Sequence, residues 1–184
     1  MIIYLIAGPP GIGKSTYGRE LVPTDIPIVD HDLAAQQYKK EGLLDYSQLA
    51  SQKANQFING CIKEKVDFAL ELNLGYKSHY EYLRSLVVSD KHVRVHLILF
   101  FTENVNLCLL RAKARFENGG HLVAPGIIEE MYKNTLPLLK RNLSIFSLFT
   151  FVSVTNTEIE VVTGSNIPAW VEKFDLTKYI QSGI

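Results

Sequence analysis

The strongest chemical signal in the chain is a glycine-rich segment near its start. Residues 8–15 read Gly-Pro-Pro-Gly-Ile-Gly-Lys-Ser and directly follow the apolar run 1–7. Between a strand and a helix, such glycines let backbone N–H groups curl around an anion. The alternative is a chance glycine-rich turn, but such a turn would not be expected to match every position of the phosphate-loop motif. Lys14 is expected to reach the terminal phosphates of ATP, and the Ser15 hydroxyl to hold Mg²⁺. The residues expected to contact ATP are Gly8, Pro9, Pro10, Gly11, Ile12, Gly13, Lys14, Ser15 and Thr16.

Three carboxylates follow apolar runs that read as strands. Asp30 and Asp32 come after the run 26–29, and Glu71 lies near the end of the run 66–72. Open parallel sheets bind ligands beyond the carboxyl ends of their strands. Phosphoryl transfer to a hydroxyl needs one carboxylate to accept the proton and an acid that orients Mg²⁺, directly or through water. We expect Asp32 to be the base, Glu71 the orienting acid and Asp30 a substrate neighbour; alternatively, both aspartates cap the next helix.

Two arginines could supply positive charge to a moving phosphate. Arg111 and Arg115 are four residues apart, so they share one face of an expected helix. The segment Gly119-Gly120-His121 follows, and its glycines would allow the neighbouring helices to act as a lid. Surface arginines commonly meet only solvent. Beside a phosphate loop, however, we expect Arg115 to be catalytic, and Arg111 and His121 to contact the substrate.

The elements that position these residues alternate along the chain. Strand-like runs are expected at 1–7, 26–29, 66–72, 93–101, 149–155 and 158–162. Helices are expected at about 14–21, 46–62, 79–88, 105–116 and 125–143, and after Pro168. This alternation predicts an α/β fold with a parallel sheet, the run 93–101 at its centre and helices on both faces. We expect residues 1–184 to form one domain that ends in a small strand pair and a helix.

Composition restricts the possible partners. The 184 residues contain 19 Lys and Arg and 19 Asp and Glu, so no bulk charge draws the protein to nucleic acid or to a membrane surface. Neither a signal-peptide pattern nor an apolar run of membrane-spanning length is present, and we expect a cytoplasmic protein. Cys61 and Cys108 are expected to be packed thiols rather than ligands or nucleophiles.

Four motifs occur together in a familiar order. The phosphate loop is followed by Val-Asp-His-Asp-Leu-Ala at 29–34, Phe-Ala-Leu-Glu-Leu-Asn-Leu at 68–74, and Arg115 four residues before Gly-Gly-His. Over roughly residues 2–139 the chain resembles the zeta-toxin family of P-loop kinases, in particular its small standalone bacterial branch. The resemblance implies a P-loop kinase-like fold and ATP-dependent phosphorylation of a sugar hydroxyl, as on UDP-N-acetylglucosamine. It also implies that Asp32 is the general base, Glu71 a substrate-contacting or metal-orienting acid, and Arg115 a ligand of the γ-phosphate.

The chain departs from the family pattern at two places. Met131 stands where relatives usually carry a second arginine, and Leu72-Asn73 where they more often have two threonines. The leading hypothesis is a kinase that phosphorylates a small-molecule hydroxyl. The alternative is a nucleotide-binding module without transfer activity that acts through an antitoxin-like protein partner. A transporter-type ATPase is disfavoured, because the chain has no Leu-Ser-Gly-Gly-Gln signature and the run 97–101 has no closing acid.

Overall fold

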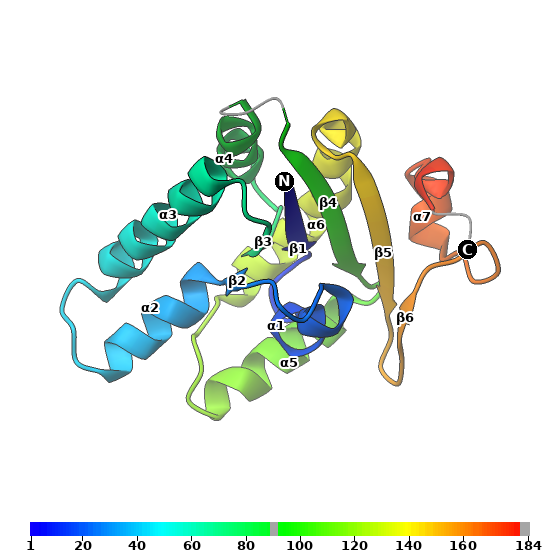
Figure 1. Cartoon of the computed structure of the whole chain (residues 1–184). Helices are drawn as coiled ribbons and strands as arrows, with labels where there is room; N and C mark the ends of the chain where they lie inside the picture. Colours follow the sequence, from blue (N-terminus) through cyan, green and yellow to red (C-terminus); the bar gives the residue numbers. More distant parts are fainter. Residues whose placement is uncertain (89–91, 181–184) are drawn as a thin grey trace.

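The computed structural model describes residues 1–88 and 92–180 and contains one six-stranded sheet. Its strand order is β2-β3-β1-β4-β5-β6 (Figure 1). The strands are β1 (Ile2–Ala7), β2 (Ile28–Val29), β3 (Phe68–Leu72), β4 (Arg94–Phe101), β5 (Leu148–Val154) and β6 (Ile159–Val161). All neighbours pair in parallel except β5 and β6, which are antiparallel. The predicted parallel sheet, the central place of β4 and the C-terminal strand pair are confirmed.

Helices cover both faces of the sheet, as predicted. They are α1 (Lys14–Tyr17), α2 (His31–Lys40), α3 (Tyr46–Glu64), α4 (Lys77–Val88), α5 (Val105–Glu117), α6 (Pro125–Arg141) and α7 (Ala169–Lys173). One core cluster joins α3, α4, α6 and α7 to the sheet, and a second joins α5 to the opposite face. Because successive strand side chains point to opposite faces, Ile3 and Leu5 of β1 enter the first cluster and Ile6 enters the second.

Two elements are shorter than the sequence predicted. The helix expected at 14–21 is α1 alone, followed by a 3₁₀ turn at Gly18–Leu21. A Cβ atom at Gly18 would lie 2.8 Å from a methyl carbon of Ile6, so the chain after α1 lies close against β1. The strand expected at 26–29 pairs only at Ile28–Val29. Pro27 has no N–H for a sheet hydrogen bond, which explains the late start.

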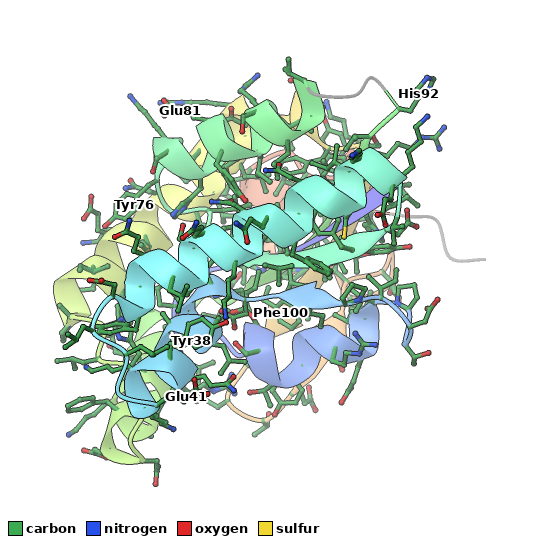
Figure 2. All side chains as sticks on the ribbon, turned by 60° about the vertical axis from the view of Figure 1, so that its left-hand side comes forward. Tyr38, Glu41, Tyr76, Glu81, His92 and Phe100 are labelled. Carbon is green, nitrogen blue, oxygen red and sulfur yellow. The ribbon has the colours of Figure 1, made fainter. Side chains whose placement is uncertain are left out.

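Helices α2 and α3 form an antiparallel pair beside the edge of the sheet (Figure 1). None of the α2 residues is buried. The two helices are joined through surface contacts. In one of them, the ammonium nitrogen of Lys53 in α3 lies 4.9 Å from the centre of the Tyr38 ring in α2 (Tyr38 is labelled in Figure 2). The α2 helix therefore packs mainly on α3.

Both cysteines are buried free thiols, as predicted. Burial raises the pKa of Cys108 to about 11, so this thiol stays protonated at neutral pH and is a poor nucleophile. Within residues 1–88 and 92–180, no helix combines the length and the apolar character that crossing a bilayer requires.

Candidate active site

The phosphate loop joins β1 to α1 and has a backbone that glycine makes possible. Gly8, Gly11 and Gly13 have φ angles of 142°, 80° and 109°. These values are strained for residues with a side chain, and glycine-rich loops of this kind can direct successive N–H groups towards a bound anion. The loop is also tightly enclosed. A Cβ atom at Gly8 would lie 2.3 Å from the Phe100 carbonyl oxygen, and one at Gly11 would lie 2.3 Å from that of Cys108.

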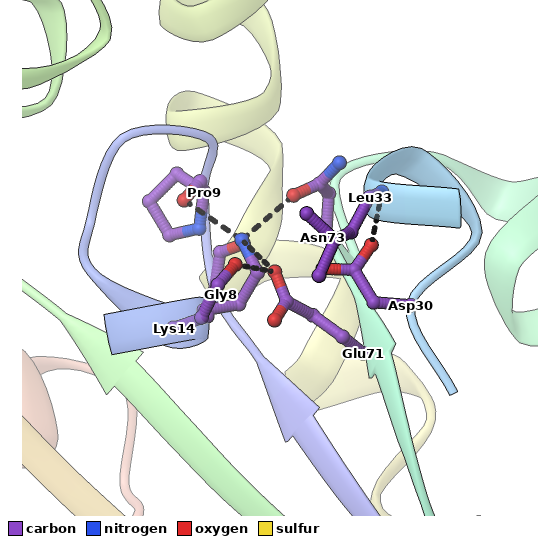
Figure 3. Close-up of polar contacts among 8 residues, drawn as sticks. Gly8, Pro9, Lys14, Asp30, Leu33, Glu71 and Asn73 are labelled. Atoms are coloured by element: carbon purple, nitrogen blue, oxygen red, sulfur yellow. Dashed lines mark hydrogen bonds and ion pairs between the residues drawn. The ribbon is translucent and has the colours of Figure 1, made fainter. Parts of the chain in front are cut away.

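Lys14 is buried at the base of this loop with its ammonium group fully engaged. Its Nζ donates to the carbonyl oxygens of Gly8 and Pro9 at 3.0 and 3.3 Å, and to Asn73 Oδ1 at 2.8 Å (Figure 3). Burial lowers the pKa of Lys14, and the nearby negative charge of Glu71 is the main influence that opposes this shift. The contacts with Gly8, Pro9 and Asn73 thus hold the cation beside the phosphate loop.

Glu71 connects the two residues that were expected to bind phosphate and metal. Its Oε1 accepts a hydrogen bond from the Ser15 hydroxyl at 3.0 Å and lies 3.9 Å from Lys14 Nζ. Burial raises the pKa of Glu71, while the charge of Lys14 acts against that rise. Because β3 lies next to β1 in the sheet, its end brings Glu71 directly beside the phosphate loop. The sequence prediction that these side chains lie together agrees with this geometry.

The two aspartates of the second motif have different environments. Asp30 is the N-cap of α2, and its Oδ1 accepts a hydrogen bond from the Leu33 N–H at 3.0 Å (Figure 3). The capping contact considered from sequence is therefore present at Asp30. Asp32 lies in the first turn of α2, is exposed and faces the same cavity as the phosphate loop. Its carboxylate is accessible to a bound ligand.

The arginines also differ from one another. Arg111 is half-buried, and its guanidinium donates to the Ile12 carbonyl oxygen at 3.1 Å, so it supports the phosphate loop. Arg115 lies exposed in the last turn of α5. The chain turns immediately afterwards, with Gly119 at a φ of 82° and the Gly120 N–H donating to the Arg115 carbonyl oxygen at 2.9 Å. The glycine pair ends the helix, as the sequence predicted.

One cavity of about 740 Å³ brings the site together. This volume is within the range of pockets that hold small molecules. Of the residues singled out from sequence, those that line it are Pro10, Gly11, Gly13, Lys14, Ser15, Thr16, Asp30, Asp32, Glu71, Arg111, Arg115 and His121. Gly8, Pro9 and Ile12 are buried in or beneath the loop and contribute backbone or packing.

The cavity is also lined by residues that were not assigned to the site from sequence, among them the polar residues Gln36, Asn73, Tyr76 and His79. The last three follow β3 within eight residues of Glu71, so their position after a strand end was an available signal. Asn73 and Tyr76 lie in the loop between β3 and α4, and His79 lies in the first turn of α4. The loop contains Leu74, which is buried with a φ of 53°. This unusual conformation for a residue with a branched side chain turns the chain across the cavity towards α4.

This loop packs directly against α6. A Cβ atom at Gly75 would lie 2.5 Å from Met131 Cβ and 2.6 Å from Met131 Cα. On the cavity side, the Tyr76 hydroxyl donates to Glu130 Oε2 at 3.1 Å (Tyr76 is labelled in Figure 2). Met131 of α6, at the position of the missing family arginine, is thus buried where α6 packs against this loop, and it lines the cavity.

Gly75→Ala is expected to destabilise the fold because the added methyl group would overlap the α6 backbone. Overpacking of this kind costs about 1–3 kcal/mol, which for a chain of this size lowers Tm by about 2–12 °C. Gly60→Ala is the matched control. Gly60 lies inside α3 with open space around its Cα, so alanine should raise stability by about 0.5–1 kcal/mol. Thermal unfolding of the two variants would refute the packing argument if Gly75→Ala proved as stable as Gly60→Ala.

The site also suits a magnesium ion held chiefly by a nucleotide. Among the described residues, no group of three or more histidine, cysteine, aspartate or glutamate side chains is arranged to hold a metal ion. Mg²⁺ does not require such a group, since it commonly takes one or two protein ligands and fills its shell with phosphate oxygens and water. The paired Ser15 hydroxyl and Glu71 carboxylate have the required hard oxygen atoms.

No family model matches the chain, and the comparisons therefore rest on individual proteins. An uncharacterized protein of Haemophilus influenzae is 28% identical over 130 residues, covering 68% of this chain and 88% of that protein. Among solved structures, a chain of the PezAT chromosomal toxin–antitoxin system of Streptococcus pneumoniae aligns with a TM-score of 0.59 at 17% identity, covering 98% of this chain and 78% of the other.

A chain of the AvrRxo1-ORF1:AvrRxo1-ORF2 complex, crystallised with ATP, aligns with a TM-score of 0.65 at 12% identity. The alignment covers 88% of this chain, which spans only 57% of the length of the AvrRxo1 chain. A candidate kinase of Chloroflexus aurantiacus aligns with a TM-score of 0.55 at 16% identity, covering 71% and 73% of the two chains. At these identities the likeness concerns the fold, and the fold is that of the P-loop kinases which the sequence motifs predicted.

Proposed function

We propose that the protein is an ATP-dependent kinase that transfers the γ-phosphoryl group of ATP to a hydroxyl of a small molecule. The observation that carries this proposal is the contact of Lys14 and Ser15 with Glu71 at the base of the cavity. A glycine-rich turn with a purely structural role would not need a buried lysine, a hydroxyl and a carboxylate joined in this way. The cavity into which they open also contains Asp32 and Arg115.

Each residue has a role that follows from its environment. The loop N–H groups and Lys14 would hold the phosphates, while Ser15, together with Glu71, would hold Mg²⁺. When bound, Mg²⁺ would supply Lewis-acid stabilisation of the phosphate charge. Asp32 would accept the proton of the attacking hydroxyl, because it is exposed to the cavity without a capping role. Arg115 would add positive charge as the phosphoryl group moves.

The acceptor and the setting of this reaction are also proposals. The zeta-toxin-like motifs favour a sugar hydroxyl, with UDP-N-acetylglucosamine as the first compound to test. We place the reaction in the cytoplasm, where ATP is available, and treat residues 1–184 as one domain. A second candidate function is nucleotide binding without transfer, exerted through a protein partner. It is favoured by the occurrence of PezAT and AvrRxo1-ORF1:AvrRxo1-ORF2, both two-component assemblies, among the structures of similar fold.

ATP–Mg²⁺ is expected to stabilise the protein against heat. At a hundredfold excess over its Kd, a ligand adds about 2.7 kcal/mol to the free energy of unfolding, which raises Tm by about 5–10 °C here. Lys14→Ala should remove most of this rise, whereas Lys113→Ala should keep it, because Lys113 is an exposed α5 lysine paired with Glu117. If millimolar ATP–Mg²⁺ leaves the Tm of the unmodified protein unchanged, both candidate functions are wrong.

A further inference from the structure

The cavity has two sides that differ in charge. Its lysine and arginine side chains, Lys14, Arg111 and Arg115, come from the phosphate loop with α1 and from α5. A second group of lining residues, which we name the acceptor wall, comes from α2 with its cap Asp30, from β3 and the following stretch up to His79, and from α6. The wall begins beside the phosphate loop, where Glu71 and Asn73 contact Lys14. Among the described residues that line this wall there is no lysine or arginine, while Asp30, Asp32 and Glu71 are all acidic.

The histidine of the acceptor wall does not replace the missing cation. His79 Nδ1 accepts a hydrogen bond from the Tyr76 N–H at 3.4 Å, which leaves the ring proton of a neutral imidazole on Nε2. Burial lowers the pKa of His79, and Lys14 lowers it further, although the charge of Asp32 acts in the opposite direction. At neutral pH the ring therefore offers an aromatic face and one N–H donor rather than a positive charge.

Besides the amide side chains of Gln36 and Asn73, the rest of the wall is largely aromatic and apolar. The rings of Tyr76 and His79 have their centres 5.6 Å apart. Ile127 and Met131 are four residues apart on α6 and line the same cavity, so they present apolar surface from one helix face. Lys77 follows Tyr76 in sequence but is exposed and is not among the lining residues. The wall thus combines acids for hydroxyl groups with a surface suited to a ring.

Charge decides which acceptors this wall can hold. Proteins bind phosphate and diphosphate groups with arginine, lysine or converging N–H groups, because burying an anion without such partners is unfavourable. A nucleotide or a nucleotide sugar would bring further negative charge beside Asp30 and Asp32, whereas Glu71 is already paired with Lys14. An uncharged alcohol would meet only hydrogen-bond acceptors and donors on the same wall.

We propose that the acceptor is an uncharged, ring-bearing alcohol of the nucleoside or simple-sugar class, rather than a phosphorylated nucleotide or a nucleotide sugar. This inference rests on the proposed kinase function, and it differs from the nucleotide sugar that the zeta-toxin-like motifs favour. In the reaction the hydroxyl oxygen of the acceptor forms a bond to the γ-phosphorus of ATP, and the bond from that phosphorus to the bridging oxygen breaks. ADP leaves with the electron pair, and the hydroxyl proton passes to the Asp32 carboxylate.

The test measures ADP release and product formation by the full chain with ATP–Mg²⁺ and matched acceptors. Uridine and adenosine are compared with UMP and AMP, and N-acetylglucosamine is compared with UDP-N-acetylglucosamine. We expect at least one uncharged compound to be phosphorylated with a kcat/KM at least about tenfold above that of its phosphorylated counterpart, since unpaired like charge opposes binding. Nucleosides and sugars are separate arms, so the result also identifies the ring.

Ile127→Lys tests whether charge on the wall is the cause. Ile127 is 41% exposed, so lysine can be placed there without being buried. The preference is the kcat/KM for the uncharged acceptor divided by that for its phosphorylated counterpart. Ile127→Lys should lower this ratio by about tenfold, whereas Ile127→Gln, which is polar but uncharged, should keep it within about threefold of the native value. An equal effect of both variants on this ratio would overturn the electrostatic explanation.

The remaining outcomes separate this inference from the proposed function. If the native protein prefers UMP, AMP or UDP-N-acetylglucosamine, the protein is a kinase but the inference is wrong. If ATP–Mg²⁺ raises Tm while no acceptor of either charge is phosphorylated, the kinase proposal fails, and the inference fails with it.

Discussion

Asp32→Asn is expected to lower turnover of the acceptor by about 10²–10⁴-fold, the usual contribution of a general base. The substitution keeps the shape of the side chain and removes its capacity to take a proton. Affinity for ATP–Mg²⁺ should change little, because Lys14, Ser15 and Glu71, rather than Asp32, form the contacts at the phosphate loop. Steady-state turnover and the ATP-induced rise in Tm, measured on the same preparation, test both statements.

Asp30 provides the matched control for this prediction. It is two residues away and caps α2 through its contact with the Leu33 N–H. Asp30→Ala should therefore reduce stability by about 0.5–2 kcal/mol, whereas Asp32→Asn should leave stability nearly unchanged. The opposite pattern, with normal turnover and reduced stability for Asp32→Asn, would give Asp32 a structural role and favour the binding module. A fall in turnover without loss of ATP binding would favour the kinase.

The fold and the base of the site could be predicted because their signals are local. The phosphate loop is a contiguous motif, and the rule that ligands bind beyond parallel strand ends places Glu71 and the aspartates near it. Alternating apolar runs likewise identified the strands and the central place of β4. Even the competing interpretations of Asp30 and Asp32 followed from sequence, although only the structure assigns the capping contact to Asp30.

The acceptor wall could not be predicted because it depends on contacts between distant segments. The Asn73 side chain contacts Lys14, 59 residues earlier in the chain, and the Tyr76 hydroxyl contacts Glu130, 54 residues later. The left-handed conformation of Leu74 has no simple sequence signature, since glycine usually takes such positions. The length of a strand can also depend on a single backbone N–H group. For example, β2 begins only at Ile28, after Pro27, which has no N–H to donate.

Arg115→Ala is expected to lower turnover by at least about a hundredfold, since an arginine that contacts the moving phosphate can contribute about 10³–10⁵ in rate. ATP binding should change only modestly, because this contact strengthens as charge develops in the transition state. The position of Arg115 supports the role. It lies in the last turn of α5 and lines the cavity, and Gly120 fits so closely that a Cβ atom there would lie 2.7 Å from Arg115 Cγ.

Two other basic residues of α5 make the experiment on Arg115 specific. Lys113→Ala removes an exposed positive charge from the same helix, outside the residues that line the cavity, and should leave turnover nearly unchanged. Arg111→Ala removes the contact with the Ile12 carbonyl oxygen, so it should weaken ATP–Mg²⁺ binding by loosening the phosphate loop. Measurements of kcat and of the ATP-induced rise in Tm distinguish the three variants. If Arg115→Ala and Lys113→Ala have equal kcat, Arg115 does not contact the phosphate, and the positive charge for transfer comes from Lys14 and Arg111.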